Sequence, residues 1–170
     1  MVASPIPLIT EAWELFKIPD LFTIRGTRTT PIEDLEYSGS GEYPYVTTQS
    51  TNNGVRGFFG IKTEDAGVLT IDSAVCGYCS YQALSFSASD HVEKLIPQFE
   101  MDIYVAMFFV TIFNMEQYRY NYGRKCSQTR LKEAEIRLPV GSTGEPDYNF
   151  MREYISHLAY SSNLEAEKDN

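Results

Sequence analysis

The segment at residues 103–113, with the sequence IYVAMFFVTIF, constrains the fold of this chain more than any other stretch. It has 11 residues and no charge, whereas a segment that crosses a bilayer needs about 20 apolar residues. The segment is therefore too short to span a membrane, and we expect a helix over residues 101–118. A helix that is apolar on nearly every side is covered on every side in the folded protein, so we expect this helix to be buried.

Length and composition predict one globular domain. A chain of 170 residues suits a single domain, and its 43% hydrophobic and 14% aromatic content is enough for a core. Three cysteines fit poorly with a disulfide framework. The first ten residues lack a basic region followed by an apolar run. We expect a cytoplasmic protein with no membrane association, a single domain over residues 1–160 and a flexible acidic tail over residues 161–170.

The chain is acidic, but its charges are segregated along the sequence. The formal net charge is −9. Residues 64–102 hold seven acidic residues against Lys94, a net charge of −6, whereas residues 103–140 hold six Lys and Arg residues against three Glu residues, a net charge of +3. A protein that is acidic overall can present a local basic surface whose field attracts a polyanion. The net charge therefore does not exclude nucleic acid as a partner, and a solvated surface is the other interpretation.

The first half of the chain has the composition of strands separated by turns. Asn53 and Gly54 predict a tight turn, because both residues tolerate positive φ. Residues 31–38 predict a short helical turn that continues into a flexible loop, and residues 11–17 predict an amphipathic turn that ends at Pro19. The predicted strands cover residues 21–24, 45–50, 58–62 and 67–72, with extended structure continuing over residues 74–88.

The pattern changes after residue 88. Ser89 or Asp90 can cap a helix, and Glu93 completes a capping box with Asp90, so we expect helical structure to begin here and to include His91. The long buried helix is expected to break at Gly123.

A strand and a second helix are expected at the end of the domain. Residues 135–140 predict a strand, and Asp147 is a candidate cap for the last helix. The apolar face of that helix is expected to contain Phe150, Tyr154, Ile155 and Leu158. The fold class is therefore α+β (α/β), with a β-rich N-terminal half, a buried helical insert and a C-terminal helix.

Cys76 and Cys79 form a C-x-x-C motif that has three interpretations. A redox pair requires the motif at a helix N-terminus, and a zinc site requires four ligands, whereas only Cys126, His91 and His157 remain. We favour a turn in a sheet with buried thiols. Because the sequence has no phosphate loop, dinucleotide fingerprint or nucleophile elbow, we expect no enzymatic activity, no cofactor and no bound metal.

Three polar and basic segments share one composition and fall in predicted loops. They are RGTRTT at 25–30, TTQSTNNGVRG at 47–57 and YGRKCSQTR at 122–130. Arg and Lys pair with phosphates or guanine, Asn and Gln make paired hydrogen bonds to adenine, and Tyr can stack on a base. Binding residues concentrate in loops. The composition favours nucleic-acid binding, with ordinary turn chemistry as the alternative.

The ordered series FTIRGT, YPYVTTQSTNNGVRGFF, YQALSFSASDHVEKLIP, YNYGRKCSQTRLKEAEIRLPV and GEPDYNFMREYI resembles a known family. It is similar to a target recognition domain of restriction-modification systems. Such domains occur in the specificity (S) subunits of Type I enzymes and in related Type IIG and BcgI-like proteins. The resemblance extends from Trp13 to Tyr154, and its most specific part runs from the Y-G-R-K sequence to the I-x-L-P-V sequence.

The resemblance implies a domain that reads a few base pairs of double-stranded DNA and has no catalytic activity of its own. It implies a partner DNA methyltransferase subunit that modifies adenine and, in a restriction complex, a restriction subunit. Among the implied contacts, Arg124, Lys125 and Arg130 would anchor phosphates, and Tyr122 would stack or pack beneath them. The residues expected at the DNA are Arg25, Arg28, Thr48, Gln49, Asn52, Asn53, Arg56, Tyr122, Arg124, Lys125, Ser127 and Arg130.

Two departures from the family bear on this interpretation. A full S subunit has two recognition domains separated by long helices, whereas this sequence predicts one domain and no long helix beyond residue 160. The net charge of −9 predicts weak and salt-sensitive affinity for the isolated chain, because phosphate contacts supply most non-specific affinity. We expect the methyltransferase to supply further positive surface. The alternative is a protein-interaction module of the same fold that has lost DNA binding.

Overall fold

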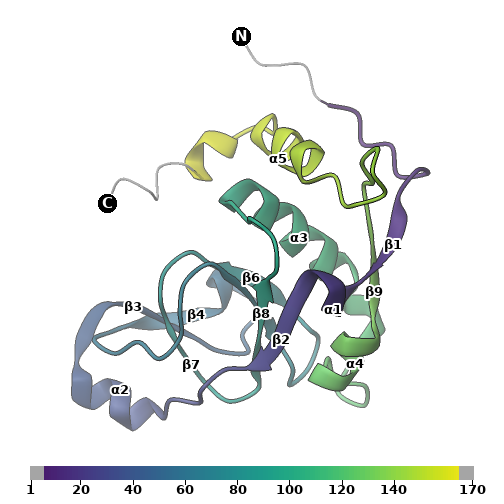
Figure 1. Cartoon of the computed structure of the whole chain (residues 1–170). Coiled ribbons are helices and arrows are strands. Elements are labelled where there is room, and N and C mark those ends of the chain that lie inside the picture. The colour runs from purple at the N-terminus through teal and green to yellow at the C-terminus, as the bar shows by residue number, and fades with distance from the viewer. Residues whose placement is uncertain (1–5, 165–170) are drawn as a thin grey trace.

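The structure, a computed structural model, describes residues 6–164. Helix α3 lies between the largest β-sheet and helix α5 (Figure 1). The helices are α1 (Ile18–Leu21), α2 (Ile32–Ser38), α3 (Ile103–Met115), α4 (Gln128–Glu133) and α5 (Tyr148–Ser156). The strands are β1 (Glu14–Lys17), β2 (Phe22–Gly26), β3 (Ser40–Val46), β4 (Val55–Phe59), β5 (Val68–Asp72), β6 (Cys79–Gln82), β7 (Ser87–Ala88), β8 (Val92–Pro97) and β9 (Glu135–Leu138). The α+β class is thereby confirmed.

The strands form a four-stranded, a three-stranded and a two-stranded sheet within the described residues. Their orders are β2-β8-β5-β6, β4-β3-β7 and β1-β9. In the four-stranded sheet every pairing is antiparallel, and Leu95 of β8 lies opposite both Ile24 of β2 and Leu69 of β5. These three side chains are buried in the core cluster that also contains α3. The central row of the sheet therefore provides the apolar surface that the buried helix requires.

Helix α3 is buried by aromatic and aliphatic side chains from both sides. Phe109 is fully buried, and its ring lies edge-on to Phe22 of β2 with 5.2 Å between centroids. On the other side, Met151 and Ile155 of α5 are buried in the same cluster. Burying one such side chain contributes about 1.5–3 kcal/mol. The predicted helix is confirmed within residues 101–118 and is largely buried, but Thr111 and Met115 are exposed, so it is not covered on every side. It ends at Met115 and not at Gly123.

Side-chain hydrogen bonds fix both ends of α3. At its start, the Asp102 carboxylate accepts from the backbone N–H of Val105 at 2.9 Å and forms an ion pair with Arg152 of α5. Near its end, the Asn114 amide bridges the edge of the sheet: its oxygen accepts from Cys79 N–H at 2.8 Å, and its nitrogen donates to Cys79 C=O at 2.9 Å. The helix is thus fixed to α5 at one end and to β6 at the other.

The predicted helix start at residues 89–93 is wrong. Residues 92–97 form β8, and His91 lies outside any helix with φ 58°. The capping pattern is local, whereas β8 pairs with β2 on one edge and β5 on the other, and tertiary pairing of a strand on both edges overrides a local cap.

Several element boundaries in the first half also differ from the prediction. Residues 11–17 do not form an amphipathic turn; Glu14–Lys17 is strand β1, which pairs with β9. Pro19 does not end a turn but lies in the first turn of α1, where its missing N–H costs nothing. Strand β3 occupies the predicted flexible loop after α2 and ends at Val46, so residues 47–50 are not a strand.

The predicted strands at 58–62 and 67–72 lie in different sheets. Of the first, only residues 58–59 are strand, at the end of β4; of the second, residues 68–72 form β5. Of residues 74–88, only Cys79–Gln82 and Ser87–Ala88 are strand. The strand at residues 21–24 is confirmed within β2, and the tight turn is confirmed by φ values of 54° at Asn53 and 74° at Gly54.

The last third of the domain follows the sequence pattern closely. Strand β9 lies within residues 135–140, and the Asp147 side chain caps α5 by accepting from Phe150 N–H at 2.9 Å. The apolar face differs in part, because Met151 is fully buried and Leu158 is 44% exposed. Helix α4 was not predicted; Ser127 caps it by accepting from Arg130 N–H at 3.4 Å.

The predicted acidic tail lies largely outside the described residues. Its first part, Ser161–Leu164, forms a short 3-10 helix, and residues 165–170 are not described. In the described part of the chain, no helix combines the length and apolar character needed to cross a membrane.

Removing the Asp102 side chain is expected to destabilise the domain, because it leaves the Val105 N–H at the start of α3 without its cap. Loss of an N-cap of this type costs about 0.5–2 kcal/mol, so Asp102→Ala should lower the free energy of unfolding in urea by about 1 kcal/mol. Asp102→Asn is the control, because Asn caps as well as Asp but cannot pair with Arg152. Equal losses in the two variants would show that the ion pair, and not the cap, carries the contribution.

The same carboxylate is expected to make stability depend on acidity. Partial burial raises the pKa of Asp102, but the hydrogen bonds from Val105 and Arg152 and the Arg152 charge outweigh it, so the pKa lies below the ordinary value of 3.8. A group with a depressed folded pKa contributes stability above its unfolded pKa and loses it as pH falls through the folded pKa. Urea unfolding between about pH 5 and pH 2.5 should therefore decline less steeply in Asp102→Asn than in the unaltered chain.

Candidate nucleic-acid interface

One end of the four-stranded sheet collects the polar segments that the sequence singles out. Because β2, β8, β5 and β6 alternate in direction, the carboxyl ends of β2 and β5 lie beside the amino ends of β8 and β6. Arg25 is near the end of β2, and the turn at 73–78 connects β5 to β6. The loops at 47–54 and 120–127 both contact this turn. We refer to this end of the sheet as the loop end.

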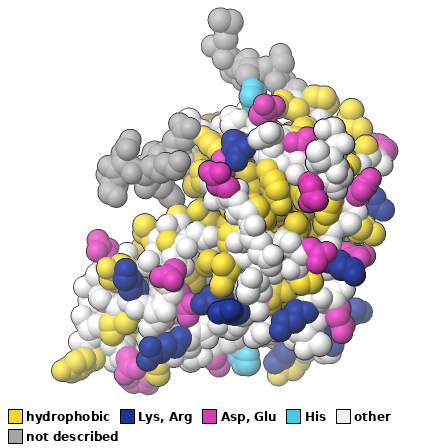
Figure 2. Space-filling view, in the orientation of Figure 1, with side chains coloured by type: hydrophobic (Ala, Val, Ile, Leu, Met, Phe, Trp, Pro, Cys, Tyr) yellow, Lys and Arg dark blue, Asp and Glu magenta, His cyan; other side chains and the backbone are white. Residues whose placement is uncertain are grey.

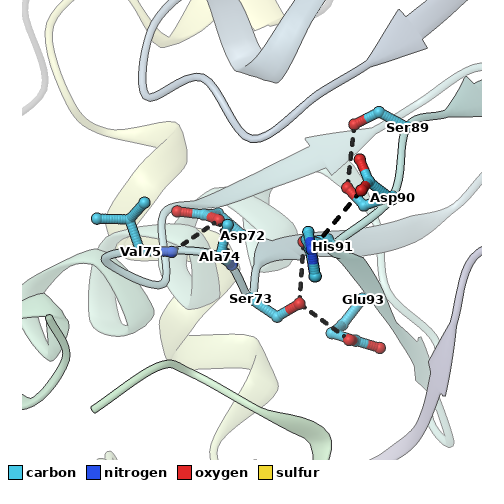
Figure 3. Close-up of polar contacts among 8 residues, drawn as sticks. All are labelled: Asp72, Ser73, Ala74, Val75, Ser89, Asp90, His91 and Glu93. Atoms are coloured by element: carbon cyan, nitrogen blue, oxygen red, sulfur yellow. Dashed lines mark hydrogen bonds and ion pairs between the residues drawn. The ribbon is translucent and has the colours of Figure 1, made fainter. Parts of the chain in front are cut away.

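A carboxylate at the end of β5 holds the turn in one shape (Figure 3). Asp72 is buried, and its Oδ1 accepts from the backbone N–H groups of Ala74 at 2.7 Å and Val75 at 3.3 Å, while its Oδ2 accepts from Cys76 N–H at 3.1 Å. Three donors on one carboxylate satisfy backbone groups that a turn otherwise leaves to water. The turn therefore presents Val75, which is 44% exposed, from a fixed backbone.

Ser73 joins this turn to the start of β8. Its hydroxyl lies 3.0 Å from the carbonyl oxygen of His91 and 3.0 Å from Glu93 Oε1 (Figure 3). The other oxygen of Glu93 is buried and has no hydrogen-bond partner among residues 6–164. His91 itself is exposed, and its φ of 58° turns the chain from Asp90 into β8.

The loop at 47–54 is held by its own amide side chains. Gln49 Nε2 donates to the carbonyl oxygens of Thr51 at 3.1 Å and Val55 at 2.7 Å. Asn52 Nδ2 donates to Val55 C=O at 2.9 Å, and Asn53 Nδ2 donates to Tyr81 C=O at 2.8 Å. The amide nitrogens of these three predicted site residues are thus used to build the loop.

The loop at 120–127 packs on the same turn. Gly77 has φ 72°, and a Cβ at this position would lie 3.0 Å from the Tyr120 ring and 3.1 Å from Cys126, so a larger residue would separate the turn from the loop. On the other side of the turn, Ser50 Oγ lies 3.6 Å from Cys76 Sγ. The structure therefore brings two of the three predicted loops together on one turn.

The Y-G-R-K segment forms a small exposed knob on this loop. Asn121 and Arg124 form an antiparallel bridge, and Gly123 N–H donates to the Asn121 side chain at 2.9 Å. Lys125 Nζ lies 5.6 Å from the centroid of the Tyr122 ring. Tyr122 is 80% exposed, so it does not pack in the core and its ring face is accessible.

The predicted site residues divide into those with structural partners and those that are free. Ser127 caps α4, and Arg130 Nη1 donates to Lys125 C=O at 2.7 Å. Thr48 is half-buried. Among the described residues, no hydrogen bond or ion pair involves the exposed guanidinium groups of Arg25, Arg28, Arg56 and Arg124.

Not all of these residues lie together. Arg124 and Arg130 line a groove of about 400 Å³ beside α4, together with Arg119, Glu133 and Glu135. Arg28 lines a separate groove beside α2, described below. Figure 2 shows Lys and Arg side chains gathered along the lower part of the molecule, interspersed with acidic ones, where Figure 1 places α4, α2 and the end of β2.

The sequence predicted a turn at the C-x-x-C motif, residues 76–79, but not the side chains that support it. Residues 74–88 were otherwise expected to be extended, and Asp72, Ser73 and Gly77 were not singled out. The available signal was an Asp and a Ser directly after an apolar strand, because both side chains commonly accept from backbone N–H groups two residues further on.

Two of the three cysteines are buried, and Cys76 is partly exposed. Cys76, Cys79 and Cys126 are all free thiols. Burial raises the pKa of Cys79 well above its ordinary value, and burial, partly offset by a hydrogen bond with Tyr120, raises the pKa of Cys126 to about 12. Such thiols are protonated at neutral pH and are poor nucleophiles. No group of three His, Cys, Asp or Glu residues in the described ranges could hold a metal ion. The predicted turn is present, and of its two thiols Cys79 is buried whereas Cys76 is partly exposed.

Comparison with known proteins identifies relatives of this chain. It is 29% identical over 154 residues to the specificity subunit S.BcgI of a Type II restriction enzyme from Heyndrickxia coagulans, an alignment that covers 86% of this chain and 43% of that subunit. The fold is similar to a Type I S subunit from M. genitalium, with a TM-score of 0.64 and 15% identity over 89% of this chain and 40% of that one.

A second solved structure has the same fold. The HsdS subunit from Thermoanaerobacter tengcongensis superposes with a TM-score of 0.59 and 10% identity over 97% of this chain and 40% of that one. The chain thus spans about two fifths of the length of the relatives it matches. The model of the Type I restriction modification DNA specificity domain matches residues 10–167. The chain belongs to the Type I restriction modification DNA specificity domain family.

Proposed function

We propose that this chain is a sequence-specific recognition module for double-stranded DNA in a restriction-modification system. The observation that carries the proposal is the loop end, where the polar and basic loops of a specificity-domain chain are supported by one hydrogen-bonded turn. A surface that combines free guanidinium groups with an exposed tyrosine ring matches the chemistry that protein–DNA interfaces use for phosphates and base edges.

The free arginines suit different parts of this task. Arg25 lies near the end of β2, on a strand of the central sheet, and such rigid elements hold a side chain more precisely than loops do. Its guanidinium can pair with guanine through two parallel hydrogen bonds. Arg124 and Lys125 lie on the exposed knob beside Tyr122, where contact with the DNA backbone needs no defined base geometry. We assign Arg25 to base recognition and the knob to phosphate anchoring.

The partner and the reaction follow from the family. We propose that the module has no catalytic activity and positions a DNA methyltransferase subunit, and a restriction subunit where one is present, on the site that it reads. The chain covers about 43% of S.BcgI, so similarity to that subunit alone does not assign a partner. The assignment rests on membership of the family. We also propose one domain over residues 1–160, an acidic tail beyond it and a cytoplasmic location, where such a complex meets DNA.

The first test is selection of bound duplexes from a random-sequence library at low salt. The chain should be tested alone and with an adenine methyltransferase subunit. An enriched motif of a few base pairs is the expected result. If a folded chain enriches no motif in either condition, recognition is excluded, and the protein-interaction module of the same fold becomes the better explanation.

Substitutions at the loop end should separate phosphate anchoring from base recognition. Arg124→Ala and Lys125→Ala should weaken binding to all duplexes alike and should each reduce the salt slope of log K by about 1. Arg25→Ala should cost about 1–3 kcal/mol on the selected motif and relax one position of it. Arg25→Lys is the matched control, since it keeps the charge but lacks the planar fork. Equal effects of all these variants on every sequence would contradict this division of roles.

A further inference from the structure

A second groove beside α2 contains positive charge that the loop end does not account for. It has a volume of about 390 Å³ and lies between residues 28–31, helix α2 and residues 61–63. Its walls include Arg28, Thr30, Asp34, Tyr37, Lys62 and Thr63. Of these residues only Arg28 belongs to the set that the sequence predicts for DNA contact.

Hydrogen bonds to neighbouring strands fix the wall of the groove. Thr30 N–H donates to Ala88 C=O at 2.8 Å, and its hydroxyl lies 3.3 Å from that of Thr63. Thr63 N–H donates to Phe86 C=O at 2.9 Å, and the Tyr45 hydroxyl donates to Thr30 C=O at 3.1 Å. The two segments that carry Arg28 and Lys62 are therefore held side by side by the β7 region.

The one buried acid next to the groove is already neutralised. Glu64 is buried, accepts from the backbone N–H of Arg28 at 2.5 Å and forms an ion pair with Lys94. Its charge is therefore matched by Lys94 and does not offset the groove cations. The side chains of Arg28 and Lys62 are exposed, and no ion pair within the described residues involves either of them.

Aromatic and acidic side chains at the groove also affect what it can bind. Lys62 Nζ lies 5.3 Å from the centroid of the Tyr43 ring, a cation–π contact that orients the ammonium group. Tyr37 is 95% exposed, so its hydroxyl is available as a donor. Asp34 is the one acidic side chain in the groove wall. Two unmatched cations and an exposed phenol against one carboxylate favour an anionic ligand with oxygen acceptors.

The position of the groove connects it to the loop end. Residues 27–31 continue directly from β2, and Thr27 donates to Val92 C=O through both its N–H, at 3.1 Å, and its hydroxyl, at 2.8 Å. The segment therefore leaves the sheet at the same end as the turn at 73–78. In Figure 1 the segment runs from the end of β2 to α2 along the lower side of the molecule, with α4 at the other end of that side.

We infer that this groove binds a backbone phosphate of the DNA duplex, with Lys62 and Arg28 as the charged contacts and Tyr37 as a hydrogen-bond donor. This inference rests on the proposed function and extends it, because it places phosphate contacts at α2 as well as on the knob near α4. Contacts at two separated places fix the orientation of a protein on a duplex and carry no sequence information.

The test measures binding of a fluorescent random-sequence duplex by the whole chain between about 20 and 200 mM salt. Lys62→Ala should reduce the slope of log K against log salt by about 0.9, the value for one phosphate, and should weaken binding to every sequence alike. Lys62→Arg should restore the slope, and Asp34→Asn should strengthen binding. Lys17→Ala in β1, a residue that lines neither groove, is the matched control for loss of one positive charge and should leave the slope unchanged.

The outcomes separate this inference from the proposed function. If the unaltered chain shows a salt-dependent affinity that Lys62→Ala leaves unchanged, the groove does not bind a DNA phosphate, and a free anion or no ligand is its occupant, while the proposed function stands. An equal loss of slope in Lys17→Ala and Lys62→Ala would also overturn the inference, because it would reflect net charge alone. If the unaltered chain shows no salt-dependent binding at all, both the inference and the proposed function fail.

Discussion

The burial of helix α3 is the constraint on which the rest of this domain depends. A helix without a polar face needs cover on most of its surface. Here the four-stranded sheet covers one side and α5 the other, and Thr111 and Met115 stay exposed between them. Asn114 near the end of α3 is hydrogen-bonded to Cys79 at the start of β6. These bonds fix the position of the sheet relative to the helix. The turn at 73–78 comes directly before that strand, so the supporting turn of the loop end is fixed relative to the core.

The sequence predicts best where a signal is local and agrees with the tertiary structure. The apolar run of α3 and the Asp147 cap of α5 are of this kind. The capping pattern around Asp90 was misleading, because β8 pairs with β2 on one edge and β5 on the other, and no local pattern reveals that a segment will be paired in this way. Strand β1 was missed for a related reason: its partner β9 is more than 100 residues away, and only the folded chain brings Phe16 opposite Ile136.

For the candidate site, too, local composition was visible in the sequence and the contacts set by the tertiary structure were not. Composition identified the loops, since Arg, Asn, Gln and Tyr in turns are what a nucleic-acid surface requires. It could not show that Gln49 and Asn52 donate to the backbone of Val55, that Asn53 donates to Tyr81 of β6, or that Tyr122 is exposed. It did not single out Asp72 as the carboxylate that fixes the turn. It also gave no indication of Lys62 beside Arg28, because that arrangement depends on which segments the sheets bring together. The segregation of charge, by contrast, was visible in the sequence and explains how a chain of net charge −9 keeps basic grooves.

The internal hydrogen bonds of the 47–54 loop and the Asp72 turn have a consequence for the kinetics of recognition. Fixing the backbone of one residue costs about 1–2 kcal/mol of conformational entropy, and here that ordering takes place during folding of the domain. A preorganised surface leaves less entropy to be lost on contact with a ligand. Variation at the exposed side chains can then change which ligand is bound while the supporting backbone stays the same. Such changes are expected to act mainly on the lifetime of the complex and less on its rate of formation.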